Sequence, residues 1–140
     1  MAETVARSAV DNGAGPFAAL RGAQFIRLTT FRKNGVGVPT QVWFAQVGDT
    51  LYITTMPEAG KVKRIRNNPR ALVAPCDARG VASGADIEAR ARVLPPEDAA
   101  RAREALRAKY GLRYALIRLL GRIVRRQESE RAYLAVMPAT

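Results

Sequence analysis

Four cationic side chains lie close together in one short stretch of the sequence, TTMPEAGKVKRIRNNPR, which spans residues 54–70. The stretch predicts a helix over 61–67, and its first two turns carry Lys61, Lys63, Arg64 and Arg66. A helix N-terminus has a partial positive charge and free N–H donors, so each cation there is unfavourable by up to ~1 kcal/mol. A bound anion would reverse this balance. The stretch is therefore a candidate anion site.

The order of residues in this helix sharpens the hypothesis. Val62 and Ile65 would face the core at a spacing of i, i+3, which leaves Lys61 and Arg64 together on another side. Two cations one turn apart, beside free N–H groups and after the strand end at Thr54 and Thr55, would form a phosphate cradle. The alternative is a surface helix whose cations extend into water. The local pattern does not decide between the two.

Two absences restrict the chemistry. The chain has no histidine, and Cys76 is its single cysteine. This excludes Ser-His-Asp and Cys-His nucleophilic sites, the usual zinc sites and an internal disulfide, so we expect no metal. An enzyme with this composition would depend on a bound cofactor for its chemistry.

The net charge of +11 on 140 residues predicts an anionic partner, which would be nucleic acid, anionic lipid or a small molecule with several phosphates or carboxylates. The alternative is a solvated basic surface without a specific partner. The arginine-rich stretch 112–126 favours packing against the rest of the fold over lipid binding, because its apolar stripe lacks Trp and Phe.

Single residues outside the cationic stretch are further candidates for the site. Trp43, the only tryptophan, would pack in the core or stack on a planar cofactor, and the first is the commoner fate of a lone Trp. Cys76 is expected to be a small buried group. Asp77 and Arg79 lie in a loop, where an arginine either closes a turn or reaches an anionic ligand.

Alternating apolar residues predict the elements that position these side chains. Three strand-like runs between residues 25 and 55 are separated by Asn34-Gly35 and Gly48-Asp49, which predict hairpin turns. Pro39 cannot donate to a ladder and marks an edge or a bulge. Further elements are a short helix over 16–21, strands over 70–76, 86–94 and 131–138, and helices over 97–109 and 112–126 that are separated near Gly111.

This order predicts an α+β fold with a mainly antiparallel sheet that closes as a barrel. We expect one domain over 1–140, with 1–15 flexible and a helical insertion over 95–126 before the last strand. No apolar run is long enough to span a membrane, and the N-terminus does not have the pattern of a signal peptide. A cytoplasmic protein is therefore expected.

Four motifs in this order, LTTFRKNG, VPTQVWF, the stretch from Thr55 through GKVKRI to NP, and CDARG, resemble the pyridoxamine 5′-phosphate oxidase-like split-barrel family. The likeness is greatest to its branch of deazaflavin (coenzyme F420)-dependent oxidoreductases, and it covers residues 20–95 closely. It implies an FMN-binding split barrel of six strands with flanking helices. It also implies a homodimer with the cofactor at the subunit interface.

The resemblance implies a role for particular residues. The cofactor phosphate would lie at Lys61 and Arg64, where the helix begins after Gly60. The pocket would be lined by Thr54 and Thr55. The deazaflavin ring would meet the segment Thr40, Gln41, Val42 and Trp43. Nearby would lie Cys76, Asp77 and Arg79, with Arg32 or Arg79 toward the anionic tail of the cofactor.

The resulting hypothesis is an F420-dependent reductase that transfers hydride to a small organic substrate. FMN is the alternative cofactor, and a protein that binds or stores F420 without turnover is the alternative function. No catalytic acid is assigned: water, Tyr110, Tyr114 and Tyr133 all remain open as proton donors. A nucleic-acid-binding protein is a third possibility. The strands have few exposed aromatic residues among their basic residues, and this argues against a surface on which bases stack.

Overall fold

The computed structural model describes residues 15–120 and 131–139, and for 112–120 it describes the backbone. The predicted flexible start of the chain and the C-terminal end of the predicted helix 112–126 lie outside these residues. Six antiparallel strands form a closed barrel in the order β1-β2-β3-β6-β5-β4. The strands are β1 (Phe25–Phe31), β2 (Gly37–Val47), β3 (Thr50–Thr55), β4 (Arg70–Cys76), β5 (Ile87–Val93) and β6 (Ala132–Pro138). The predicted α+β barrel is confirmed.

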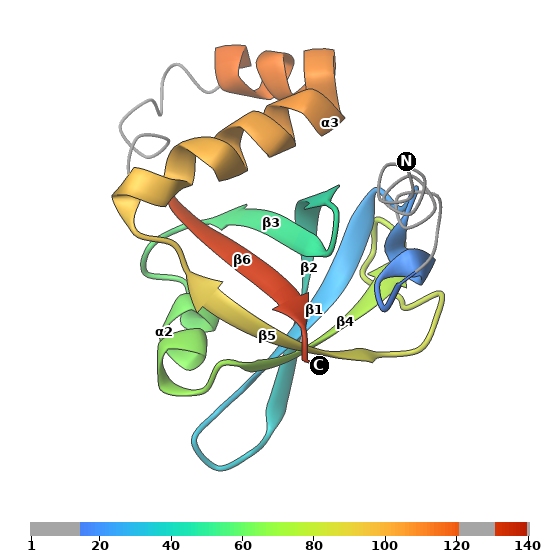
Figure 1. Ribbon diagram of the computed structural model, residues 1–140, viewed down its shortest axis with the longest axis vertical. Coiled ribbons are helices and arrows are strands. Elements are labelled where there is room, and N and C mark those ends of the chain that lie inside the picture. Colours follow the sequence, from blue (N-terminus) through green and yellow to red (C-terminus); the bar gives the residue numbers. More distant parts are fainter. Residues whose placement is uncertain (1–14, 121–130, 140) are drawn as a thin grey trace, which may run out of the picture.

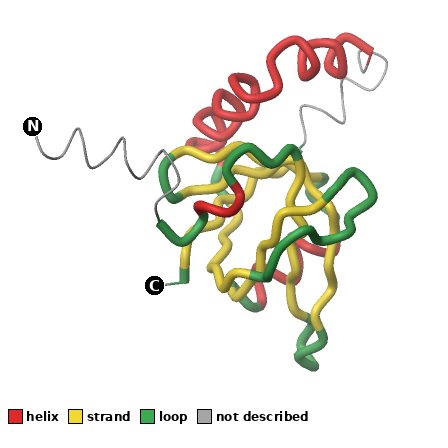
Figure 2. The backbone as a smooth tube through the Cα atoms, turned by 90° about the vertical axis from the view of Figure 1, so that its right-hand side faces the viewer, coloured by secondary structure: helices red, strands yellow, loops and turns green. Residues whose placement is uncertain are grey.

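The predicted hairpin at Asn34-Gly35 joins β1 to β2 and extends beyond the barrel (Figures 1 and 2). Gly35 adopts a φ of 89°, which suits glycine, and its N–H donates to the carbonyl of Arg32 at 2.8 Å. The side chain of Asn34 accepts a hydrogen bond from the N–H of Val36 at 3.0 Å. These local bonds fix the register in which Phe31 lies opposite Gly37.

Strand β2 changes partner along its length. Residues 37–43 pair with β1, and residues 44–47 pair with β3. Pro39 lies opposite Thr29 in the first part, where no described strand pairs with the other side of β2. The prediction that Pro39 marks an edge is confirmed, and its missing N–H costs no ladder hydrogen bond there.

The interior of the barrel is apolar. In β1 the side chains of Ile26 and Leu28 are fully buried, and Thr30 continues the same face at 0% exposure. The other strands add alternate residues to this core. Its largest fully buried members are Phe17, Phe44, Leu20, Ile26, Leu28, Leu51, Ile53, Leu134, Val62, Val73 and Val136.

Helices cover the barrel at separate places (Figure 1). A 3₁₀ turn, η1 (Ala18–Leu20), lies within the predicted short helix, and α2 (Gly60–Asn67) follows β3. A second turn, η2 (Pro96–Asp98), leads into α3 (Ala99–Leu120), which runs along the outside of the barrel (Figure 2). Gly111 has non-helical angles, φ 50° and ψ −125°, inside α3. The predicted interruption near Gly111 is therefore confirmed.

The first half of α3 packs by a stripe of Ala102, Leu106 and Tyr110, spaced four residues apart. These side chains form a second cluster with Ala45, Tyr52 and other residues on the outer face of the sheet. Among the described residues, no helix is long and apolar enough to cross a membrane.

Candidate functional site

Helix α2 begins without the usual capping groups. The residue before it, Ala59, offers no side-chain cap, and the first turn contains no acidic residue. Val62 and Ile65 are 0% and 3% exposed, which confirms the side of the helix predicted to face the core. The cations at the start of α2 therefore lie off this buried face, beside N–H groups that have no acidic partner on the helix.

Three cations at this place each donate to a threonine hydroxyl. Lys61 Nζ is 3.4 Å from Oγ1 of Thr55. Arg64 Nε donates to Oγ1 of Thr30 at 2.6 Å. Arg131, directly before β6, donates through Nε to Oγ1 of Thr54 at 2.8 Å. These bonds gather the ends of β1, β3 and β6 around the start of α2.

Gly60 makes room for one of these cations. A Cβ atom at this position would lie 2.7 Å from Nη1 of Arg64, closer than real side chains approach. The guanidinium of Arg64 therefore lies against the first residue of its own helix. This places its charge beside the first turn of α2, in which the N–H groups of Val62 and Lys63 donate to the carbonyl of Ala59 at 3.0 and 3.4 Å.

The electrostatics of the group indicate an excess of positive charge. The pKa of Lys61 is lowered, first by burial of the ammonium and then by the charges of Arg64 and Arg131. The pKa of Arg64 is lowered by burial and by the charge of Arg32. Both shifts have the direction that like charges and desolvation produce when no anion compensates them.

No carboxylate compensates these charges in the part of the chain that the structure describes. Its three salt bridges join Arg27 to Asp86, Arg70 to Glu88 and Arg107 to Glu104. None of them includes Lys61, Arg64 or Arg131, which we call the cationic cluster. A threonine hydroxyl orients a cation but does not neutralise it, so the cluster has the charge and the donors to hold a phosphate or carboxylate.

The segment 40–43, predicted to meet the cofactor ring, runs along the unpaired edge of β2. Thr40 donates to the carbonyl of Leu28 at 3.4 Å, and Gln41 Nε2 donates to the carbonyl of Ala78 at 2.6 Å. Val42 is 7% exposed and belongs to the barrel core. A ligand on this edge would meet the backbone of Val42 and not its side chain.

The predicted loop residues form a separate group. Cys76 is buried, and this burial raises the pKa of its thiol. Asp77 Oδ1 accepts from the N–H groups of Arg79 and Val81 at 2.9 and 3.0 Å, so its carboxylate closes the loop. The side chain of Gln41 ties β2 to this loop.

The structure does not bring this loop to the cationic cluster. Cys76 lies opposite Phe25 at the start of β1, whereas Thr30 lies five positions further along the strand. At about 3.3 Å per residue this separation is roughly 16 Å. The predicted site residues therefore form two groups near opposite ends of β1, with the edge of β2 between them.

Trp43 packs by stacking within the protein. Its ring lies 4.8 Å from that of Tyr110 with an interplanar angle of 24°, and Phe25 lies at 6.4 Å. This geometry favours the packing interpretation of Trp43, although the side chain is only partly buried. The stack joins β2 to α3.

The candidate proton donors differ in what surrounds them. The hydroxyl of Tyr110 donates to the carbonyl of Gln24 at 2.8 Å and lies 3.0 Å from both N and O of Phe44. These backbone contacts disfavour proton donation by Tyr110. Tyr133 is buried with Arg103 over its ring, and the side chain of Tyr114 lies outside the described residues.

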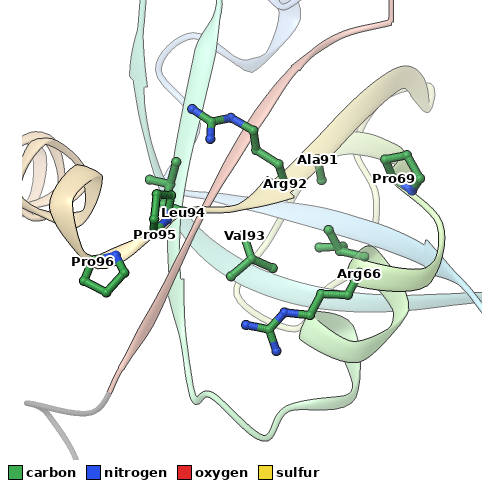
Figure 3. Close-up of a pocket in the computed structure, with 9 residues that line it drawn as sticks. Arg66, Pro69, Ala91, Arg92, Val93, Leu94, Pro95 and Pro96 are labelled. Atoms are coloured by element: carbon green, nitrogen blue, oxygen red, sulfur yellow. The ribbon is translucent and has the colours of Figure 1, made fainter.

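One cavity of about 420 Å³ lies on the other flank of α2 (Figure 3). None of the predicted site residues lines it. Its lining comes from the end of α2, from β5 and from the turn into η2, and consists of Ile65, Arg66, Pro69, Ala91, Arg92, Val93, Leu94, Pro95 and Pro96.

Sequence reasoning missed Thr30 and Arg131 as members of the cluster. Thr30 belongs to the motif LTTFRKNG, but the alternation along this strand indicated only that it shares a face with Ile26 and Leu28. Arg131 is 77 positions from Thr54, and their contact depends on the pairing of β3 with β6. Arg131 would have been identified only by predicting that β3 pairs with β6 in the register that places Thr55 opposite Ala132.

Comparison with known families gives one match, in which the family model of pyridoxamine 5′-phosphate oxidase covers residues 17–139. Among curated proteins, no sequence matches the chain. Solved structures with a similar fold are described with different ligands and activities.

Three of these structures illustrate the range. An F420 reductase has 19% identity and a TM-score of 0.58, and the match covers 91% of this chain and 95% of that one. The heme storage protein HutZ from Vibrio cholerae has 15% identity, a TM-score of 0.60 and coverages of 86% and 84%. A FAD-binding protein from Mesorhizobium loti has 16% identity, a TM-score of 0.54 and coverages of 87% and 84%. At these identities the likeness shows the fold alone.

Proposed function

Because this chain belongs to the pyridoxamine 5′-phosphate oxidase family, we propose that it is an oxidoreductase that uses coenzyme F420 to reduce a small organic molecule. The observation that carries the proposal is the cationic cluster. Its three cations are oriented by threonine hydroxyls and have no carboxylate partner among the described residues. The choice of F420 over other cofactors rests on the motifs of the sequence, because structures described as an F420 reductase, a FAD-binding protein and a heme storage protein share the fold.

The residues present fit a phosphate-bearing cofactor. A phosphate needs charge and N–H donors, which Lys61, Arg64 and the first turn of α2 supply. Gly60 leaves room at the start of the helix for the guanidinium of Arg64, which can therefore donate from this position. The pKa of Lys61 is lowered by burial and then by the charges of Arg64 and Arg131, and a bound anion would favour the charged form.

In this proposal the chain binds and orients the cofactor, and it contributes no side-chain nucleophile. Lys61, Arg64 and Arg131 hold the phosphate, and Thr54 and Thr55 orient two of these cations. The edge of β2 at Thr40, Gln41, Val42 and Trp43 offers its unpaired backbone to the ring system. A bound deazaflavin would supply hydride transfer, which explains how an enzyme without histidine can work.

The loop with Cys76, Asp77 and Arg79 would define the far end of the site. Its distance from the cluster, roughly 16 Å along β1, suits an elongated cofactor better than a compact anion. We also propose that the functional unit is a homodimer, in which a second copy completes the cofactor site. This part of the proposal rests on the resemblance of the sequence motifs to the split-barrel family.

A titration of the purified protein with F420 and, separately, with FMN tests the proposal. Ligand fluorescence and Trp43 emission report binding, and oxidation of reduced F420 by a panel of unsaturated acceptors reports turnover. We expect tight F420 binding, weaker FMN binding and turnover with at least one acceptor. Preference for FMN would change the proposed cofactor to FMN and leave the proposed phosphate site unchanged, because FMN also carries a phosphate.

Two further outcomes would contradict the proposed activity. Tight F420 binding with no turnover against any acceptor would favour a binding or storage protein. If neither F420 nor FMN binds, the basic surface is left unexplained, and nucleic acid would be tested next through the salt dependence of its binding.

A further inference from the structure

Thr30 is a polar residue at a position where the barrel core would favour an apolar one. It continues the inward face of β1 after Ile26 and Leu28, and all three side chains are 0% exposed. A buried hydroxyl costs free energy unless it has a hydrogen-bond partner, and valine would fill a similar space without one. Packing of the core therefore does not explain a threonine at this place.

The partner of this hydroxyl is a guanidinium of the cationic cluster. Oγ1 of Thr30 accepts from Nε of Arg64 at 2.6 Å, although Arg64 lies 34 positions later in the chain. The same arrangement occurs a second time, because Oγ1 of Thr54 accepts from Nε of Arg131 at 2.8 Å. Both arginines of the cluster are therefore held by Nε, and the donors on their terminal nitrogens Nη1 and Nη2 remain for other partners.

The terminal nitrogens of both arginines lie beside the same short connection, which leads from β3 into α2. Nη1 of Arg64 lies against Gly60, where an added Cβ would be 2.7 Å away. Nη1 of Arg131 lies 3.9 Å from Sδ of Met56. The two guanidinium groups therefore approach the connection from different elements, one from α2 and the other from the start of β6.

The two hydroxyl groups hold these guanidinium groups without reducing their charge. A carboxylate in place of either threonine would orient the same Nε atom, but it would also neutralise the cation and compete with an anionic ligand. Threonine is branched at Cβ, which restricts the rotation of its side chain and so fixes its hydroxyl. Immobilising an arginine costs rotamer entropy, and here both arginines are ordered before a ligand binds.

From these observations we propose that Thr30 and Thr54 are positioning residues for the anion site, each holding one arginine by Nε so that its terminal nitrogens are directed toward the phosphate of the ligand. This inference rests on the proposed function, in which the cluster holds a phosphate. It gives Thr30 a role that the packing of the barrel does not require. The affinity of the site then depends on two uncharged hydroxyl groups as well as on the charges.

Thr30→Val tests this role because it replaces the hydroxyl by a methyl group and leaves the net charge unchanged. The F420 dissociation constant should rise about tenfold, as for the loss of one hydrogen bond to a charged group. The urea midpoint should stay the same or rise, since the core gains an apolar group and water can reach the partly exposed Arg64. Thr30→Ser keeps the hydroxyl and should retain most of the affinity. A purely structural role predicts the opposite for Thr30→Val, a lower midpoint with unchanged affinity.

Thr29→Val is the matched control. Thr29 is also buried, at 8% exposure, but it lies on the other face of β1 from Thr30, and no hydrogen bond of its hydroxyl is described. This variant should bind F420 as the original protein does. Thr54→Val applies the test to Arg131 and should also raise the dissociation constant. Oγ1 of Thr54 donates to the carbonyl of Ala132 at 3.4 Å as well, so Thr54→Ser is measured beside it to retain the hydroxyl.

A second measurement needs no ligand. In two-dimensional NMR of the free protein, the Nε–H groups of Arg64 and Arg131 should exchange slowly with water because each is hydrogen-bonded. Their signals are assigned with Arg64→Lys and Arg131→Lys. Thr30→Val should make the exchange at Arg64 fast and leave the exchange at Arg131 unchanged.

Two results would overturn the proposal: an F420 dissociation constant of Thr30→Val equal to that of the original protein, or exchange at Arg64 that does not differ between the two proteins. If the original protein binds neither F420 nor FMN, the proposed function fails. The same variants are then compared with inorganic phosphate as the probe, and equal phosphate affinities would overturn the positioning role too. The failure of the cofactor assignment and the failure of this inference are therefore distinguishable.

Discussion

Arg131 donates a 2.8 Å hydrogen bond through Nε to Oγ1 of Thr54, a residue 77 positions earlier in the chain. The pairing of β3 with β6 brings the two residues together, because Thr54 lies opposite Tyr133 and Thr55 opposite Ala132. The bond holds the guanidinium of Arg131 beside Lys61, and the charge of Arg131 helps to lower the pKa of Lys61. A closed barrel thus adds a third cation to a pair that belongs to one helix.

Replacing Arg131 should weaken cofactor binding without unfolding the protein. Arg131→Met removes one charge that we place on the phosphate, and the loss of a charge-assisted contact predicts an F420 dissociation constant about tenfold higher. Arg101→Met is the matched control, because Arg101 is an exposed cation on α3 outside the cluster. Fluorescence titration at two salt concentrations would measure the F420 dissociation constants of both variants. Equal affinities in the two variants would remove Arg131 from the site.

Gly60→Ala separates the stability of α2 from its binding role. Alanine is the better helix former by up to about 1 kcal/mol, so the free energy of unfolding should stay the same or rise. The new Cβ would lie 2.7 Å from Nη1 of Arg64 and must displace this flexible guanidinium. We therefore expect weaker F420 binding in a protein with an unchanged urea midpoint. Unchanged affinity would show that the position of Arg64 over Gly60 is not needed for binding.

The hydroxyl of Tyr110 completes the ladder where β2 changes partner. It reaches N and O of Phe44 and the carbonyl of Gln24, just beyond the last pair of β1 with β2, Phe25 opposite Trp43. Tyr110→Phe leaves buried backbone groups without this partner and should cost about 1–3 kcal/mol. Urea unfolding followed by circular dichroism measures the loss.

Tyr52→Phe is the control for this experiment. Tyr52 is also buried in the cluster beneath α3, but no hydrogen bond of its hydroxyl is described. It should lose clearly less stability than Tyr110→Phe. If the two variants are equally stable, the hydroxyl of Tyr110 does not support the fold at this junction.

Lys109 should make stability depend on pH. Its ammonium lies 3.4 Å from the centre of the Phe44 ring and donates to the carbonyl of Ala23 at 2.8 Å, and the residue as a whole is exposed. Burial of the charged end lowers its pKa from 10.5 to about 8. Between these two values the unfolded chain binds more protons than the folded one, so this contribution to stability rises with pH.

Comparison with Lys109→Met isolates this contribution from other titrating groups. The free energy of unfolding of the original protein, relative to that of the variant, should rise between pH 8 and 10.5 and stay constant below pH 7. The wild-type side chain is partly exposed, so we expect solvent screening to reduce the size of the effect. A difference that is flat across this range, or that falls, would contradict the assigned pKa shift.

Local patterns were sufficient to predict most of the fold. β4 has the predicted bounds, β5 is one residue shorter at each end, and the interruption near Gly111 lies inside α3 as expected. Alternation in β1 placed Ile26, Leu28 and Thr30 on one face, because side chains of a strand point to opposite sides in turn, but it did not identify which face is buried. Asn34-Gly35 fixed the first hairpin for equally local reasons.

Contacts between distant residues were not predicted from the sequence. The partner of Arg131, the acceptor of Arg64 on β1 and the backbone contacts of Tyr110 all depend on strand register or on how α3 lies on the barrel. The cavity beside Arg66 likewise requires β5 and the turn at Pro95 to meet the end of α2. Hydrophobic periodicity gives no information about contacts between elements, because it describes one element at a time.

The most direct test of the proposed function compares two double variants that remove the same charge. Lys61→Ala, Arg64→Ala removes two cations of the cluster, and Lys63→Ala, Arg101→Ala removes two exposed cations outside it. The measurement is the F420 dissociation constant of each protein at one salt concentration. We predict an increase of about a hundredfold for the first variant and nearly none for the second. Equal dissociation constants for the two variants would contradict the assignment of the phosphate to this cluster.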